Sequence, residues 1–203
     1  MIITKEMLEE KQACEPGLKW FIENFGNSAR HEDILKKLEE EKNTKVWGDW
    51  LLKKFQLSGE AKSWHPNGQQ AYIWNFKNGN EHGKQEYWNE NGNLDHILNY
   101  KDGKLHGIQT RWHDNGKKFY IHNYKNGKLH GKQEYWHDNG KQFYIDNYKD
   151  GEKHGVQKSW HKNGQQFYID NFKNGEKHGV QKSWHDNGQQ AYILNYKNGK
   201  RIE

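Results

Sequence analysis

The sequence has few of the features that stabilise or direct many small proteins. Its 203 residues include one cysteine, Cys14, so an internal disulfide framework and a cysteine-based zinc site are excluded. No basic segment followed by an apolar run opens the chain, and no apolar stretch reaches the roughly 18 residues of a membrane span. We therefore expect a soluble, cytoplasmic protein that is not secreted and has no transmembrane segment.

The overall apolar content is low, and aromatic residues compensate for it. The hydrophobic fraction is 32% and the mean hydropathy is −1.38, values that accompany disorder when net charge is high and aromatic residues are few. Here ten Trp, eleven Tyr and eight Phe accompany a net charge of only +5. The chain should therefore fold, with aromatic rings supplying much of the buried apolar area.

Positive charge is concentrated after residue 58. Residues 1–58 contain 10 Lys or Arg and 11 Asp or Glu, whereas residues 59–203 contain 22 and 16. Because this excess is spread over a long segment and not gathered in one patch, we do not expect a specific nucleic-acid partner.

An internal repeat of 24 residues occupies the second part of the chain. Asn-Gly pairs recur at this spacing, and their glycines are predicted to be structural turns: Gly68, Gly92, Gly116, Gly140, Gly164 and Gly188. Tryptophans keep the same spacing at Trp64, Trp88, Trp112, Trp136, Trp160 and Trp184. A second glycine series, from Gly79 to Gly199, lies about halfway between, and His-Gly pairs follow it.

Two glycine turns in each repeat separate segments of strand length that are rich in β-forming residues. We therefore predict about twelve antiparallel strands over residues 59–203, arranged as six hairpins. The expected fold class is mainly β: an elongated single-layer antiparallel hairpin array, preceded by a small N-terminal α-helical cap.

The pairing register can be predicted from the turns. A two-residue loop at Asn163-Gly164 would pair Trp160 with Phe167, and Gly155 with Phe172. It would also pair Lys158 with Ile169, and continuing through Asn174-Gly175 would pair Ile169 with Val180. One face would then carry Trp160, Phe167, Ile169 and Val180, and the other would carry Tyr168 and Phe172. A three-residue loop is the alternative, and it would reverse the faces.

Residues 1–58 lack the period and have helical patterns. Leu18, Phe21 and Phe25 share one helical face, Ser28 is a candidate N-cap for a following helix, and a third apolar stripe runs from Val46 to Phe55. We expect a small helical domain over 1–58 that covers the first strand of a six-repeat domain over 59–203, because repeat arrays need a capped end.

The repeats resemble a known family. The stretch Tyr124–Gly131, followed by Tyr135, Trp136 and Gly140, is similar to the MORN repeat, in which an aromatic residue, a glycine, a His-Gly pair and a further aromatic residue and glycine succeed one another. The resemblance covers about residues 59–200. The period is 24 where 23 is usual, and glutamine replaces a further glycine at Gln85, Gln109, Gln133, Gln157 and Gln181.

These departures resemble a variant class found in antitoxin-like bacterial proteins, large DNA viruses and protists. In a viral protein, the expected location would be the virion or the host cytoplasm. The resemblance implies a twisted array of hairpins that serves protein interaction, with lipid-headgroup binding in some members.

The thirteen histidines do not form a metal pattern. Equivalent residues one repeat apart lie about 9.6 Å apart, at roughly 4.8 Å per strand, whereas two imidazole nitrogens on one zinc lie only about 3.3 Å apart. We therefore predict that His82, His106, His130, His154 and His178 stabilise turns, and we expect no metal and no cofactor. No catalytic residues are expected either, since candidate acids such as Asp146 and Asp170 are repeated copies on an open surface.

The tryptophan column is the candidate binding stripe, and packing between neighbouring strands is its alternative role. We expect a non-catalytic scaffold for a protein partner whose identity the sequence does not give. A phospholipid-binding module on a membrane surface and a glycan-binding aromatic repeat are the alternative functions. The strand edge after Gly199 could mediate self-association, because unpaired edges template pairing.

Overall fold

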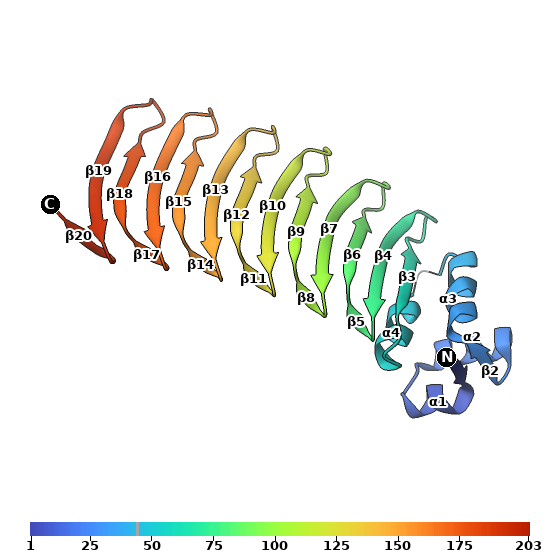
Figure 1. Cartoon of the computed structure of the whole chain (residues 1–203). Helices are drawn as coiled ribbons and strands as arrows, with labels where there is room; N and C mark the ends of the chain where they lie inside the picture. Colours follow the sequence, from blue (N-terminus) through green and yellow to red (C-terminus); the bar gives the residue numbers. More distant parts are fainter. Residues whose placement is uncertain (44) are drawn as a thin grey trace. The chain divides into compact units, whose positions relative to one another are not determined.

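The computed structural model describes residues 1–43 and 45–203, which form two compact units, Met1–Asn93 and Leu94–Glu203. The first unit contains all the described helices together with the first hairpins, and the second unit contains only hairpins (Figure 1). The predicted fold class, mainly β with antiparallel hairpins and N-terminal helices, is confirmed.

The helical part of the first unit is built around a small apolar core. Its elements are β1 (Ile2–Thr4), α1 (Lys5–Glu10), α2 (Glu15–Phe25), β2 (Ser28–Arg30), α3 (His31–Glu40) and α4 (Trp47–Lys54). Ile3, Leu8 and Phe21 are at most 5% exposed in this core. Ser28 does not cap a helix, because it pairs with Thr4 in the two-stranded ladder of β1 and β2, and Arg30 precedes α3.

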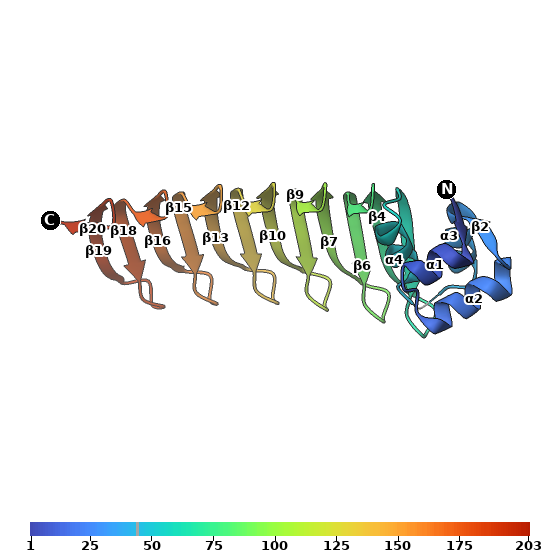
Figure 2. The same cartoon turned by 90° about the horizontal axis from the view of Figure 1, so that it is seen from below.

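The hairpin strands follow one pattern in both units. The first unit contains β3 (Gly59–Trp64), β4 (Gln70–Lys77), β5 (Asn80–Glu81) and β6 (Gly83–Trp88). The second unit contains β7 (Leu94–Lys101), β8 (Lys104–Leu105), β9 (Gly107–Trp112), β10 (Lys118–Lys125), β11 (Lys128–Leu129), β12 (Gly131–Trp136), β13 (Gln142–Lys149), β14 (Glu152–Lys153), β15 (Gly155–Trp160), β16 (Gln166–Lys173), β17 (Glu176–Lys177), β18 (Gly179–Trp184), β19 (Gln190–Lys197) and β20 (Lys200–Ile202). Within the second unit, the longer loops project from the same edge of the sheet (Figure 2).

The two glycine series form different turns. At Asn174-Gly175 both residues have positive φ, 51° and 80°, as a two-residue hairpin turn requires. At Asn163-Gly164 only the glycine has a positive φ, of 96°. There the Gly164 N–H donates to the His161 carbonyl at 2.8 Å, and the His161 N–H donates to the Gln165 carbonyl at 2.8 Å. The two-residue loop predicted at Asn163-Gly164 is therefore wrong, and the loop is longer.

The longer loop changes the register next to it. Gly155 pairs with Phe172 and Lys158 with Ile169, as predicted, but Trp160 pairs with Gln166 and leaves Phe167 in a β-bulge. The Phe167 ring then lies 5.6 Å from the Tyr168 ring. The predicted separation of these two rings onto opposite faces is therefore wrong.

A second irregularity occurs at each His-Gly pair. Ile169 pairs with Lys182 and not with Val180, because the strand is interrupted between β17 and β18. At this gap, the side chain of Gln181 supplies the hydrogen bonds that a paired backbone would otherwise make. Its side-chain oxygen accepts a hydrogen bond from the Asn171 N–H at 3.0 Å, and its amide nitrogen donates to the Asn171 carbonyl at 2.9 Å.

This glutamine arrangement recurs in five of the six repeats. The five side chains are between 0% and 2% exposed: Gln85, Gln109, Gln133, Gln157 and Gln181. We use the term glutamine face for the side of the sheet on which these glutamines lie. In the hairpin of β15 and β16 it also carries Ser159, Tyr168, Asp170 and Phe172, which pair with or alternate with Gln157.

Side chains also connect neighbouring repeats at both edges of the sheet. At one edge, the Nδ1 atom of His154 accepts a hydrogen bond from the Asn174 N–H at 3.4 Å, and His106, His130 and His178 make the equivalent contact. At the other edge, the Nδ2 group of Asn163 donates to the Asp186 carbonyl at 2.8 Å. The first set agrees with the predicted turn-stabilising role of these histidines.

Replacing Gly140 with valine should destabilise the second unit, because a β-branched residue is strained at φ 87°. Strain of this kind typically amounts to about 1–3 kcal/mol. Thermal unfolding should show a clear decrease in melting temperature. The control is Val156→Ile, at a site that is 37% exposed, where we expect a change within about 0.5 kcal/mol. Equal shifts for the two variants would contradict the assigned turn.

Candidate functional site

The glutamine face of the first hairpin is covered by a helix of the same unit. Ala61 takes the place of the glutamine there, and it is 1% exposed where α4 packs on it. Leu52 of α4, 0% exposed, joins Ala61 and Phe76 in one apolar cluster. A Cβ atom at Gly48 would lie 3.3 Å from that of Ala61. Small residues on both surfaces therefore allow the helix to approach the sheet closely.

Polar groups complete the contact between α4 and the hairpin. The Nζ atom of Lys53 lies 5.4 Å from the ring centres of both Trp74 and Phe76, in cation–π range. It also lies 3.1 Å from the Glu81 carboxylate. The Gly79 N–H donates to the Leu57 carbonyl at 2.8 Å, just beyond the helix. The expectation that the helical segment covers the first strands is thus met.

In the second unit the same face carries paired aromatic residues. The Phe143 ring lies 4.7 Å from the Tyr144 ring, and Tyr144 stacks on Tyr135 at 3.9 Å. Phe143 and Phe167 are 41% and 42% exposed, respectively. Each phenylalanine also lies against a loop histidine, with ring distances of 4.7 and 4.6 Å. The bulges therefore place exposed rings on the glutamine face.

Two carboxylates lie among these rings. Asp146 is 7% exposed, and burial raises its pKa, an effect that Lys153 opposes at 3.6 Å. Burial raises the pKa of Asp170 in the same way. One oxygen of each carboxylate is buried and has no hydrogen-bond partner among the described residues. Burial, with a contribution from both carboxylates, raises the pKa of Tyr168 to about 12.

This arrangement suits the binding of a ligand. The exposed rings of Phe143 and Phe167 offer apolar contact to a ligand, and Asp146 and Asp170 add two carboxylates to the same face. Lys153 and Lys177 keep their ammonium groups within 5.5 Å of the rings of Phe172 and Tyr196, respectively. The described residues contain no group of three metal-binding side chains. The face therefore offers exposed aromatic rings beside two carboxylates to a ligand.

The six hairpin repeats match the model of a known repeat family. A model described as the MORN repeat variant matches six segments of the chain: residues 57–78, 81–102, 105–126, 129–150, 153–174 and 177–198. Together these segments cover more than half of the sequence.

The chain belongs to the MORN repeat variant family. MORN repeats commonly mediate interactions with proteins or membranes, and proteins built from them are generally non-catalytic. A second model, described as the YdhT N-terminal domain, matches residues 1–58, before the MORN repeats.

Other comparisons give little likeness. No curated protein matches the chain. A crystal structure of a glycine-to-arginine mutant of S. aureus TarM, in complex with fondaparinux, α-GlcNAc-glycerol and UDP, is 11% identical over 82% of this chain and 32% of that one, with a TM-score of 0.32. A second TarM structure is 12% identical over 84% and 30%, with a TM-score of 0.30. The chain thus spans about a third of the length of these proteins.

The structure places the MORN tryptophans at the loop edge. Trp64 is 9% exposed and the other five tryptophans are partly buried, so none of the six presents a fully exposed ring. The backbone carbonyls of Trp88, Trp136 and Trp184 contact the preceding repeat, since they lie 2.9, 3.1 and 3.0 Å from Nε2 of a loop histidine. The six predicted turn glycines all have positive φ. The exposed Phe143 and Phe167 were not among the predicted site residues, because their placement depends on the bulge.

None of the helices in residues 1–43 and 45–203 has the length and apolar character that a membrane span requires.

Proposed function

We propose that this MORN protein is a non-catalytic interaction module that binds an α-helical segment of a partner protein on the glutamine face of its second unit. The observation that supports the proposal most directly is α4, a helix that already lies on the glutamine face of the first hairpin. The later hairpins repeat the backbone of that hairpin, so each offers a similar platform.

The side chains of the second unit indicate what the partner helix should carry. On α4, Leu52 fills the apolar position and Lys53 spreads over two rings. Asp146 and Asp170 pair with Gln133 and Gln157 and so place two carboxylates on the same face, which favours a partner segment with basic side chains. Apolar side chains of the same helix could then contact Phe143 and Phe167. A helix with adjacent basic and leucine-like residues therefore fits this face.

Photo-crosslinking tests this proposal. A benzoylphenylalanine at Phe167 should form an adduct with a protein in cells of the source organism, and the crosslinked peptide should map to a helix of that protein. The matched control carries the same residue at Val180, which is 38% exposed and alternates with Gln181 along β18, so that it lies on the opposite face. Adduct yield should fall when Asp146→Lys and Asp170→Lys are combined.

Several outcomes would contradict it. Equal adducts from both faces, or adducts unaffected by the two lysines, would remove the glutamine face as the binding surface. Adducts with phospholipid or glycan in place of protein would favour one of the alternative functions. Self-association is a separate proposal, which rests on the exposed Ile193 and Ile202 near β20.

A further inference from the structure

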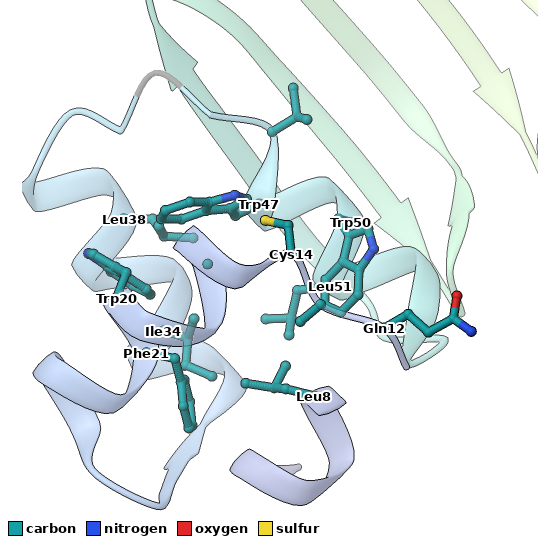
Figure 3. Close-up of a pocket in the computed structure, with 13 residues that line it drawn as sticks. Leu8, Gln12, Cys14, Trp20, Phe21, Ile34, Leu38, Trp47, Trp50 and Leu51 are labelled. Carbon is teal, nitrogen blue, oxygen red and sulfur yellow. The ribbon is translucent and has the colours of Figure 1, made fainter. Parts of the chain in front are cut away.

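The helical part of the first unit contains an apolar cavity of about 270 Å³. Side chains from the segments of α1, α2, α3 and α4 surround it, and Figure 3 shows the indoles of Trp20, Trp47 and Trp50 around the space with Phe21 and Leu51 below them. Cys14 directs its sulfur toward the same space (Figure 3). The cavity lies outside the hairpins and takes no part in the function proposed above.

The cavity opens to solvent at Cys14, which is exposed and lines it. Its lining is nearly all apolar, so the open cavity presents apolar surface to water. Removal of such surface from water is favourable in proportion to the area covered. An apolar ligand that fills the cavity would therefore bind by covering this surface.

Gly17 indicates that the space is kept open. It lies within α2, where glycine weakens a helix, and its backbone is not in a conformation that requires glycine. A Cβ atom at this position would lie 3.2 Å from the sulfur of Cys14 and 3.4 Å from the Trp47 ring. Any larger residue would therefore press on two side chains that line the cavity.

The chemistry of the lining defines the class of ligand. None of its side chains carries a charge, and the indole N–H of Trp20 is occupied, since it donates to the Glu41 carboxylate at 2.7 Å. Gln12 lies at the edge with its amide directed away from the rings (Figure 3). Since a cavity of about 150 Å³ accommodates benzene, this one has room for a larger ring system. We propose that it binds a small, uncharged, flat apolar molecule about the size of two fused rings.

The full-length protein and 1-naphthol as the probe allow a direct test. The probe should quench tryptophan fluorescence saturably at one site per chain, whereas naphthalene-1-sulfonate, which adds a charge, should bind more weakly. Cys14 gives a second readout, because it is exposed and lines the cavity. At a probe concentration about tenfold above the dissociation constant, alkylation of Cys14 by N-ethylmaleimide should slow by about tenfold.

Filling the cavity provides the decisive comparison. Ala13→Phe should abolish both the quenching and the protection of Cys14 while leaving the melting temperature unchanged or higher, and Ala13→Leu serves the same purpose with a smaller side chain if the first variant does not fold. The control is Ile22→Phe, on α2 but outside the cavity and 38% exposed, which should bind the probe like the parent protein. Absence of saturable binding to the parent, or equal binding to a folded filled variant, would overturn the proposal.

Discussion

Replacing Gln157 with alanine is expected to lower the free energy of unfolding of the second unit by about 2–4 kcal/mol. Its side chain is 0% exposed, and it accepts from the Asn147 N–H at 2.8 Å and donates to the Asn147 carbonyl at 3.0 Å. The variant would leave the Asn147 N–H without its acceptor and create a void in the sheet. An unsatisfied buried group contributes about 1–3 kcal/mol by itself.

Urea unfolding, followed by far-ultraviolet circular dichroism, measures this effect. Gln165→Ala is the matched control, because that glutamine is exposed in the neighbouring loop and should change stability by no more than about 0.5 kcal/mol. Gln157→Glu separates hydrogen bonding from volume, since it keeps the size but directs a carboxylate oxygen at the Asn147 carbonyl. If Gln157→Ala left the free energy of unfolding unchanged, the glutamine side chains would not be needed to hold the interrupted strands together.

The period of the sequence predicted most of the fold. Asn-Gly pairs at a fixed spacing indicated hairpins, and the pairs of the second series, such as Asn174-Gly175, do adopt positive φ at both residues. The first series has the same dipeptide but belongs to a longer loop closed at His161. The dipeptide alone could not distinguish them, because the loop type depends on how the flanking residues hydrogen-bond.

The candidate site was harder to predict for the same reason. One bulged residue moves Phe167 to the side of Tyr168, and no periodicity argument that assumes regular pairing can place it there. The role of Gln157 could not be predicted either. The sequence shows that glutamine replaces the usual glycine at this position, but it does not show the two hydrogen bonds that the side chain makes with Asn147. The docking of α4 depends on tertiary contacts with β3 and β4, the next strands along the chain, which local patterns do not specify.

His122 occupies, in its repeat, the position that Asp146 and Asp170 hold in later ones, and it makes this column sensitive to pH. Its ring stacks on Tyr120 at 4.0 Å and lies 4.8 Å from the Tyr135 ring. Its Nε2 atom is buried and has no partner among the described residues. Burial lowers the pKa of His122 from 6.5 to about 4. Leu98 and Leu194 fill the same column, so leucine is compatible with this site.

Acidification from pH 7 to 4 should therefore destabilise the parent protein more than His122→Leu, by about 2 kcal/mol once partial exposure is allowed for. Over this window the unfolded chain binds a proton at His122 that the folded state binds only near pH 4. Stability contributed by the neutral ring is present above pH 6.5 and is lost as pH falls. Urea unfolding at several pH values measures the difference, with His185→Leu, at an exposed loop position, as the control. Parallel pH profiles for parent and His122→Leu would show that this ring is not held neutral by burial.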